Sequence, residues 1–159
     1  VYHHRGEAEN MFAGEICTRD VVYVHRGQAV ADAARLMREH HVGDVVVVED
    51  EEGRRIPVGI LTDRDLVVEL LATGTSPDDV TVGDLMSREL LTLGEGQDLL
   101  YALEAMREKG VRRAPVTDLD GALVGLLTVD DIVAVIAEQL QDLSALVGRQ
   151  LTRERRLRP

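Results

Sequence analysis

The chain has 159 residues, of which 45% are hydrophobic and only 3% are aromatic, and its formal net charge is −11. This length and apolar fraction are typical of one compact domain, or of two half-sized repeats that share a core. The composition excludes a disordered chain, and no apolar run approaches the roughly 20 residues that span a bilayer. A single cysteine excludes an intramolecular disulfide, and no hydrophobic signal segment is visible. We therefore expect a cytoplasmic protein that does not bind a membrane.

Charge is distributed unevenly along the chain. Of the 29 acidic residues only Glu154 lies among the last eleven residues, whereas five of the 18 Arg and Lys residues do. An acidic body argues against binding of nucleic acid, whose backbone is itself negative. We interpret the Arg-rich end as a solvated helix end whose cations suit the helix dipole, with contact to an acidic partner as the alternative.

The sequence contains an internal repeat. A shift of 69 residues aligns Met37–Glu39 with Met106–Glu108, and it also pairs Arg19 with Arg88, Gly27 with Gly96, Gln28 with Gln97, Ala33 with Ala102 and Val42 with Val111. After a three-residue excess near 51–56 the shift becomes 66, which pairs Gly59 with Gly125, Leu61 with Leu127, Thr62 with Thr128, and Asp65 with Asp131. Because the order of matches is kept through both halves, we infer two copies of one unit.

Each copy has the pattern of a β-α-β-β-α unit. A short β-like run, 21–24 or 90–93, precedes a glycine turn and an amphipathic helix. The buried helix faces are expected to be Val30, Ala33, Ala34 and Met37 in the first copy and Leu99, Ala102, Leu103 and Met106 in the second. The remaining strands are expected near 45–48, 58–61, 114–117 and 123–127, with second helices that begin near Thr62 and Thr128.

A segment rich in Gly, Ser, Thr and Pro, residues 73–79, separates the two copies. After it, Thr81 and Asp84 resemble a capping box that opens a short helix. We predict four regions: an extension that is in part not native (1–13, with Met11 as a native start), repeat 1 (14–74), repeat 2 (80–140), and a helix end with an Arg-rich tail (141–159). Since a half of about 65 residues buries little core alone, we expect an α/β (α+β) fold whose repeats pack with approximate two-fold symmetry.

The paired segments Gly59–Asp65 and Gly125–Asp131 each run from a strand into a helix, with Thr at the N-cap and Asp in the first turn. Helix capping by itself explains both residue types. The same geometry also suits a nucleotide, because a helix N-terminus offers N–H groups to a phosphate and a nearby carboxylate accepts hydrogen bonds from ribose hydroxyls. The residues alone leave both interpretations open.

Both motifs, together with the segment Gly110–Val116, resemble the CBS-pair (Bateman module) family over about residues 14–140. The resemblance implies a stand-alone, non-catalytic regulatory module that binds an adenine nucleotide such as AMP, ADP or ATP in the cleft between the repeats. It implies that Asp65 and Asp131 each bind a ribose, assisted by Thr62 and Thr128. It also implies, less specifically, a set of cleft-lining residues: Thr18, Val45, Ser87, Ala114 and Pro115.

The resemblance further implies two unequal clefts. Arg112 and Arg113 occupy positions where the family often places phosphate-binding cations, and Arg64 precedes the motif aspartate of the first copy. We expect these three arginines to gather around Asp131 and to favour a phosphorylated nucleotide there. The Asp65 cleft would then hold a less charged adenosine compound or none. The alternative is that Arg112 and Arg113 are surface residues paired with nearby acids.

No pattern in the sequence predicts a catalytic residue, a catalytic cofactor or a metal site. Three alternatives to a nucleotide sensor remain: a structural dimerisation or interaction module with little ligand affinity, a sensor of S-adenosylmethionine or NAD, and the regulatory insert of a larger nucleotide enzyme such as IMP dehydrogenase. A sensor would act through an effector protein that the sequence does not identify. A wide apolar stripe on the last helix predicts a homodimer; it comprises Ile132, Val135, Ile136, Leu140, Leu143 and Val147.

Overall fold

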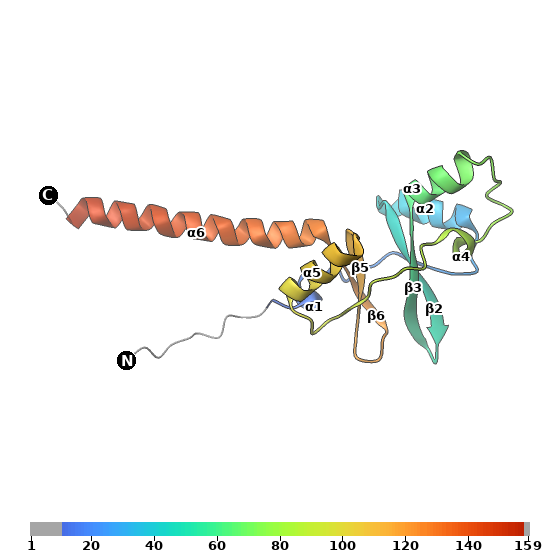
Figure 1. Ribbon diagram of the computed structural model, residues 1–159, viewed down its shortest axis with the longest axis horizontal. Coiled ribbons are helices and arrows are strands. Elements are labelled where there is room, and N and C mark those ends of the chain that lie inside the picture. The colour runs from blue at the N-terminus through green and yellow to red at the C-terminus, as the bar shows by residue number, and fades with distance from the viewer. Residues whose placement is uncertain (1–10, 158–159) are drawn as a thin grey trace.

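The computed structural model describes residues 11–157, with side chains described as far as Gln150. The predicted extension over residues 1–13 therefore lies mostly outside the described residues. Two three-stranded sheets lie side by side, and one long helix extends away from them (Figure 1). The α/β architecture with two repeats is confirmed.

The first repeat forms a sheet in the order β1-β2-β3, in which β1 runs parallel to β2 and β2 runs antiparallel to β3. A helix connects the two parallel strands, and a helix followed by a π-helical turn continues from β3. The elements are β1 (Tyr23–His25), α2 (Val30–His40), β2 (Asp44–Glu51), β3 (Arg54–Thr62), α3 (Asp63–Leu66) and η1 (Val67–Leu71). A tight hairpin turn with positive φ at Glu52 and Gly53 joins β2 to β3.

The second repeat has the same order, β4-β5-β6, with the same strand directions. Its elements are β4 (Leu93–Gly94), α5 (Leu99–Lys109), β5 (Arg113–Thr117), β6 (Leu123–Thr128) and α6 (Val129–Leu157). Gly110 ends α5 in the left-handed conformation, and His41 ends α2 in the same conformation at the equivalent position. The chain therefore repeats its backbone geometry even where a histidine replaces glycine.

The two helix faces differ slightly from the prediction. All six buried residues of α2 and α5 were expected: Val30, Ala33, Met37, Leu99, Ala102 and Met106. Leu103, however, is 38% exposed, and Ala34 is only half-buried. The strands β1 and β4 also begin later than expected, at Tyr23 and Leu93.

Two short helices exchange partners between the repeats. The helix α1 (Ala13–Ile16) precedes the first repeat in the chain, yet Ala13 and Cys17 are buried in the core of the second repeat. The helix α4 (Val82–Leu85) follows the first repeat, and Val82 and Met86 complete the core of that repeat. Each short helix thus packs on the repeat other than the one it leads into, so packing as well as the connecting chain holds the two repeats together.

Glycines at equivalent places allow this exchange. The position of a Cβ at Gly59 is 2.6 Å from Met86 Sδ and 2.8 Å from the carbonyl oxygen of Ser87. A Cβ at Gly125 would overlap Cys17 Sγ. Only glycine lets the exchanged segments approach β3 and β6 so closely.

A search of the described helices found none with both the length and the apolar character needed to cross a bilayer.

Candidate functional site

The first Thr–Asp motif closes the start of α3 with reciprocal hydrogen bonds. The Thr62 N–H and the Thr62 Oγ1 hydroxyl both donate to Asp65 Oδ2, each at 2.8 Å. In return the Asp65 N–H donates to Thr62 Oγ1 at 3.2 Å. This capping box holds the carboxylate in place through one oxygen. Within the described part of the chain, Asp65 Oδ1 makes no hydrogen bond.

The second motif has the same local geometry. The Thr128 N–H and hydroxyl donate to Asp131 Oδ2 at 2.8 and 2.6 Å, and the Asp131 N–H donates back at 3.2 Å. The prediction that Thr caps each helix with Asp in its first turn is thus confirmed for both copies. Any difference between the two motifs must come from their neighbours.

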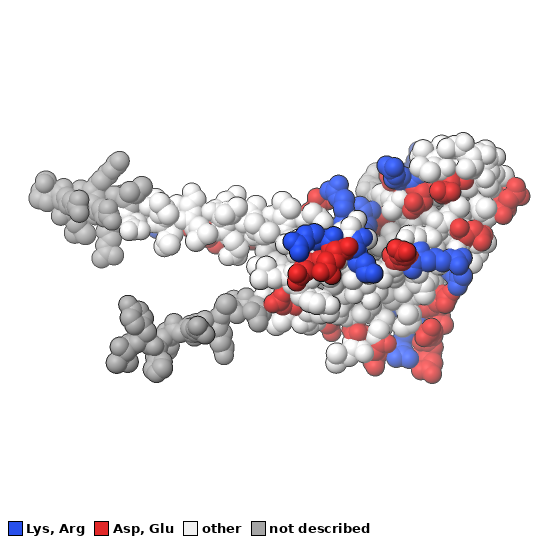
Figure 2. Space-filling model, in the orientation of Figure 1, with Lys and Arg blue, Asp and Glu red and all other residues white. Residues whose placement is uncertain are grey.

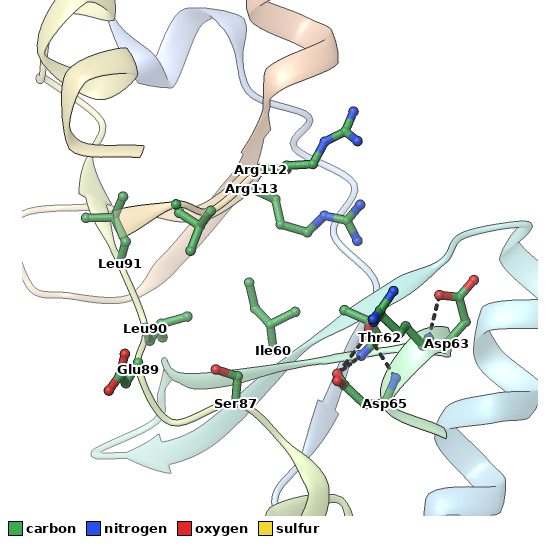
Figure 3. Close-up of a pocket in the computed structure, with 13 residues that line it drawn as sticks. Ile60, Thr62, Asp63, Asp65, Ser87, Glu89, Leu90, Leu91, Arg112 and Arg113 are labelled. Carbon is green, nitrogen blue, oxygen red and sulfur yellow. Dashed lines mark hydrogen bonds between the residues drawn. The ribbon is translucent and has the colours of Figure 1, made fainter. Parts of the chain in front are cut away.

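A cavity of about 480 Å³ lies in the cleft between the repeats, beside Thr62 and Asp65. Three segments form its walls: the end of β3 with the start of α3, residues 87–91 of the connection between the repeats, and residues 110–113 at the start of β5. Figure 3 shows Arg112 and Arg113, at the start of β5, above the junction of β3 and α3 that carries Thr62 and Asp65.

The cavity has an apolar side and a polar side. Four aliphatic side chains form the apolar side: Ile60, Leu90, Leu91 and Val111. The polar side is formed by Thr62, Asp65 and Ser87, together with three arginines: Arg64, Arg112 and Arg113. Asp63 and Glu89 add two further carboxylates to the lining. A small molecule with a flat apolar part and several polar groups suits such a lining.

Arg113 forms an ion pair with Asp44, the residue that occupies its equivalent position in the first repeat. Two equivalent residues can meet only close to the pseudo-two-fold axis, so this pair marks the axis. The Asp44 side chain is 12% exposed, and burial raises the pKa of its carboxyl, although the Arg113 guanidinium opposes the rise.

Arg112 is held more loosely than Arg113. Its side chain is 77% exposed, and its guanidinium lies 3.9 Å from the carboxylate of Asp130, which is itself exposed. Solvent screens an ion pair of this kind, so it contributes little to stability. Arg112 can therefore turn toward a ligand at small energetic cost.

The three arginines do not gather around Asp131 as predicted. Arg64, Arg112 and Arg113 line the cavity that contains Asp65. The backbone before β5 is bound to its own repeat, since the Val129 N–H donates to the Arg112 carbonyl at 2.9 Å. Arg113 nevertheless reaches across the axis to Asp44, whereas the Arg112 guanidinium lies 3.9 Å from Asp130 of its own repeat.

Several predicted lining residues lie elsewhere. Val45 and Ala114 are fully buried in the two cores, and Pro115 is buried beside Ala114, so none of them lines the cavity. Ser87 lies on the cavity wall, where its N–H donates to the Ile60 carbonyl at 2.9 Å. Thr18 makes the equivalent hydrogen bond with Leu126, on the other side of the molecule.

Sequence reasoning missed the apolar wall of the cavity. Ile60 lies two residues before the motif threonine, on the same face of β3, and this spacing was a usable signal. Leu90 and Leu91 were assigned to a strand, whereas the strand β4 begins only at Leu93. No local pattern indicated that these residues line a cavity together with Thr62 and Asp65 of the first repeat.

The positions equivalent to the cavity lining are strongly acidic on the Asp131 side. They include four aspartates and no Arg or Lys; the aspartates are Asp20, Asp44, Asp130 and Asp131. A second cavity, of about 510 Å³, borders Asp131 from the direction of α1 and α6. Within the described residues no group of three or more His, Cys, Asp or Glu side chains is placed to hold a metal ion.

A model of the CBS domain matches residues 13–72 and 82–138, which together exceed half of the chain. The chain belongs to the CBS domain family. The two matched regions correspond to the two repeats seen in the structure, each with one Thr–Asp motif. The first match includes α1, although this helix packs on the second repeat.

The family includes relatives of similar size. An uncharacterized protein of Methanopyrus kandleri is 38% identical over 122 residues, which cover 77% of this chain and 61% of that protein. This chain thus spans about three-fifths of that relative's length. Hypoxic response protein 1 of Mycobacterium tuberculosis is 32% identical over 126 residues, which cover 79% of this chain and 85% of that protein.

Solved structures of CBS pairs have the same fold. The crystal structure of Hypoxic Response Protein I, which contains two coordinated zinc ions, superposes with a TM-score of 0.67 at 33% identity, covering 78% of this chain and 98% of that chain. A CBS domain pair solved with 5′-methylthioadenosine and S-adenosyl-L-methionine superposes with a TM-score of 0.69 at 23% identity, covering 82% of this chain and 98% of that chain.

Proposed function

We propose that this CBS pair is a non-catalytic sensor that binds a phosphorylated adenine nucleotide (AMP, ADP or ATP) in the cavity beside Asp65. The observation that carries the proposal is the joint presence, in one cavity, of an anchored carboxylate, an apolar wall and three arginines. These groups match the ribose, the adenine and the phosphates of one ligand.

Asp65 is the ribose-binding residue in this proposal. Its Oδ2 is used by the capping box, while Oδ1 is available to accept hydrogen bonds from two vicinal hydroxyls. Because the capping box fixes the carboxylate before the ligand arrives, little side-chain entropy is lost on binding. Thr62 positions Asp65 and lines the same cavity.

Adenine would pack against Ile60, Leu90 and Val111, and the phosphates would bind Arg64 and Arg112. Charge-assisted hydrogen bonds from arginine to phosphate are strong, since the guanidinium offers a planar pair of donors. Arg113 contributes less, because Asp44 already occupies part of its guanidinium. A relative solved with two adenosyl compounds supports the adenosine part of the proposal.

A second ligand class suits the Asp131 side. Four aspartates at the equivalent positions favour a cation over a phosphate, and S-adenosyl-L-methionine carries a positive sulfonium. The relative that was solved with this compound shows that the CBS fold can bind it. We therefore keep S-adenosylmethionine as the alternative ligand, at Asp131. A purely structural module with little ligand affinity is the remaining alternative.

The ligand would bias the packing of the two repeats, since the cavity is built from both. Binding can shift such an equilibrium only if the ligand prefers one arrangement. An effector protein would read the change, and we propose that the module acts as a homodimer.

Isothermal titration with AMP, ATP, NAD and S-adenosylmethionine tests the proposal. We expect a phosphorylated adenine nucleotide to bind the wild-type protein, and Asp65→Asn to weaken it by about 10- to 100-fold, the value of hydrogen bonds to a charged group. Asp131→Asn is the matched control, because it makes the same change in the same capping geometry. It is expected to leave nucleotide affinity unchanged.

The opposite pattern, with affinity lost only in Asp131→Asn, would reject the Asp65 site. Binding of S-adenosylmethionine alone would favour the alternative ligand. If a folded protein binds none of the four compounds, the structural module is the better interpretation.

A further inference from the structure

Arg113 stands between the cavity beside Asp65 and a largely buried acid. Its side chain is 33% exposed and lines the cavity, while its guanidinium pairs with the carboxylate of Asp44, whose side chain is 12% exposed. A guanidinium has five N–H donors, and among the described residues this contact is the only side-chain hydrogen bond of Arg113. Arg113 can therefore donate to either of two anions: the Asp44 carboxylate or a phosphate in the cavity.

Asp44 is fixed directly beside the capping box. It is the first residue of β2, and it pairs with Thr62 in the register of β2 and β3. The turn before it is held in place by the Asp63 N–H, which donates to the Gly43 carbonyl at 2.9 Å. The aspartate side chain is short and its backbone is paired, whereas an arginine side chain has many rotamers. Arg113 is thus the partner that can move.

Most of the molecule's charge opposes an anionic ligand. The chain has 29 acidic residues against 18 Arg and Lys, and Figure 2 shows acidic side chains next to basic ones on the visible face of the repeats. A phosphate therefore meets arginines that already have carboxylate neighbours. The pair of Arg112 with Asp130 is exposed and screened by solvent, but the pair of Arg113 with Asp44 is not. Competition for an arginine should thus be strongest at the axis.

We propose that Asp44 competes with the phosphates of the nucleotide for Arg113, and thereby lowers the affinity of the Asp65 site for phosphorylated ligands. In the free protein Arg113 donates to Asp44. In the complex Arg113 turns toward a phosphate, and Asp44 loses its partner. Asp44 is a positioning residue, because it acts on the ligand only through Arg113. The inference rests on the proposed nucleotide site and names a residue that limits the affinity of that site.

Loss of the partner should be accompanied by uptake of a proton. The charged groups that face Asp44 are Arg113 from β5 and Asp63 from the start of α3. Burial raises the pKa of the Asp44 carboxyl, Arg113 lowers it, and Asp63 raises it. Withdrawal of Arg113 removes the influence of the one cation, so the pKa rises further when the phosphate binds. Proton uptake and ligand binding then favour each other, and ATP binding should strengthen as the pH falls.

Titration calorimetry with ATP tests the competition. Asp44→Asn is expected to strengthen ATP binding about tenfold, because Arg113 becomes free to form one charge-assisted contact with a phosphate. Adenosine, which has no phosphate, should bind the wild type and the variant equally. The matched control is the same substitution in an Arg113→Gln background. There no arginine is left to release, so Asp44→Asn should not change ATP affinity.

The outcomes that contradict the competition differ from those that contradict the nucleotide site. If Asp65→Asn weakens ATP binding but Asp44→Asn does not strengthen it, the ion pair is structural and this inference alone is rejected. Equal strengthening in the Arg113→Gln background would assign the effect to charge repulsion and would also reject it. If ATP binds neither the wild type nor Asp44→Asn, the proposed function is rejected together with the inference.

Proton uptake provides a measurement that a purely structural ion pair would not change. Calorimetry in buffers of different ionisation enthalpy counts the protons that are bound together with ATP at mildly acidic pH. The wild type is expected to take up more protons than Asp44→Asn, and this difference corrects for titration of the ATP phosphates themselves. With adenosine the two proteins should not differ. Equal proton uptake with ATP would overturn the proposal.

Discussion

The Asp65 side and the Asp131 side of this molecule have the same capping geometry but different surroundings. Hydrogen-bond lengths in the two capping boxes agree within 0.2 Å. Around Asp65 the two repeats contribute three arginines and an apolar wall. The equivalent positions around Asp131 contribute four aspartates and no Arg or Lys, although Arg112 lies 3.9 Å from one of these aspartates, Asp130. A duplicated motif therefore preserves the scaffold of a site, while its neighbours decide which charge the site accepts.

The largest expected effect is a loss of stability on both sides, at the glycines that let α1 and α4 pack closely on the strands. Gly59→Ala and Gly125→Ala should each destabilise the protein by about 3 kcal/mol, as overpacked sites do. Urea denaturation measures the change. Gly96→Ala is the control, because no atom lies within 4 Å of its added Cβ.

The stability lost in the two glycine variants should respond differently to a second substitution that removes the neighbouring side chain. Cys17→Ala removes the sulfur that Gly125→Ala would overlap, so the double variant should regain most of the loss. Met86→Ala cannot rescue Gly59→Ala, because the Ser87 carbonyl oxygen stays 2.8 Å from the new Cβ. Equal rescue at both sites would show that side-chain contact alone sets the cost.

The next largest effect concerns the arginines of the Asp65 side. Arg64→Gln and Arg112→Gln should each weaken ATP binding about tenfold, while leaving adenosine binding unchanged, since each removes one charge-assisted contact to phosphate. Asp130→Asn should slightly strengthen ATP binding, because it releases Arg112 from its weak ion pair. Titration calorimetry distinguishes these outcomes. Loss of adenosine binding in either arginine variant would place that arginine at the nucleoside instead.

A smaller effect is expected at the axis between the two sides. Arg113→Met leaves the buried carboxylate of Asp44 without its partner and should cost about 1–2 kcal/mol of unfolding free energy. Asp44→Asn in addition to Arg113→Met should recover part of this loss. A double-mutant cycle in urea measures the coupling. Additive effects of the two changes would show that the ion pair is not energetically coupled.

The smallest expected effect concerns the pH dependence of stability, to which Asp84 and Asp44 should contribute with opposite signs. Hydrogen bonds from the Thr81 N–H and hydroxyl lower the pKa of Asp84, so its stabilising contribution is present above the ordinary carboxyl pKa of 3.8 and is lost as pH falls through the lowered value. Burial raises the pKa of Asp44, so the folded state gains stability as acid protonates this group. Asp84→Asn and Asp44→Asn, compared with wild type over acid pH, should therefore diverge in opposite directions. Parallel curves would contradict both shifts.

Much of the fold was predictable because it rests on local patterns. The internal repeat, the helix end at Gly110 and both Thr–Asp capping boxes follow from residues close together in the chain. The cores were predictable from helix periodicity, with Leu103 as the exception. Hydrogen bonds within one turn, and burial along one helix face, depend on few other parts of the molecule.

The site itself was only partly predictable. Thr62 and Asp65 were named from the motif and Ser87 from the family resemblance, but the cleft around Asp131 was expected to receive the arginines. The error concerned which side of the pseudo-two-fold axis the arginine side chains line. The spacing of residues in the chain does not determine this, because it depends on how the two repeats pack. Leu90 and Leu91 were missed for the same reason, since they line a cavity whose walls come from both repeats.

The sequence by itself determined that this protein has two CBS repeats, each with a capped helix start that positions one aspartate. Only the tertiary structure decided that α1 and α4 exchange partners, that Asp44 and Arg113 meet at the axis, and that the arginines line the Asp65 cavity. The physical reason is range: capping and periodicity act within a few residues, whereas charge at a site between repeats is the sum of segments that only packing brings together.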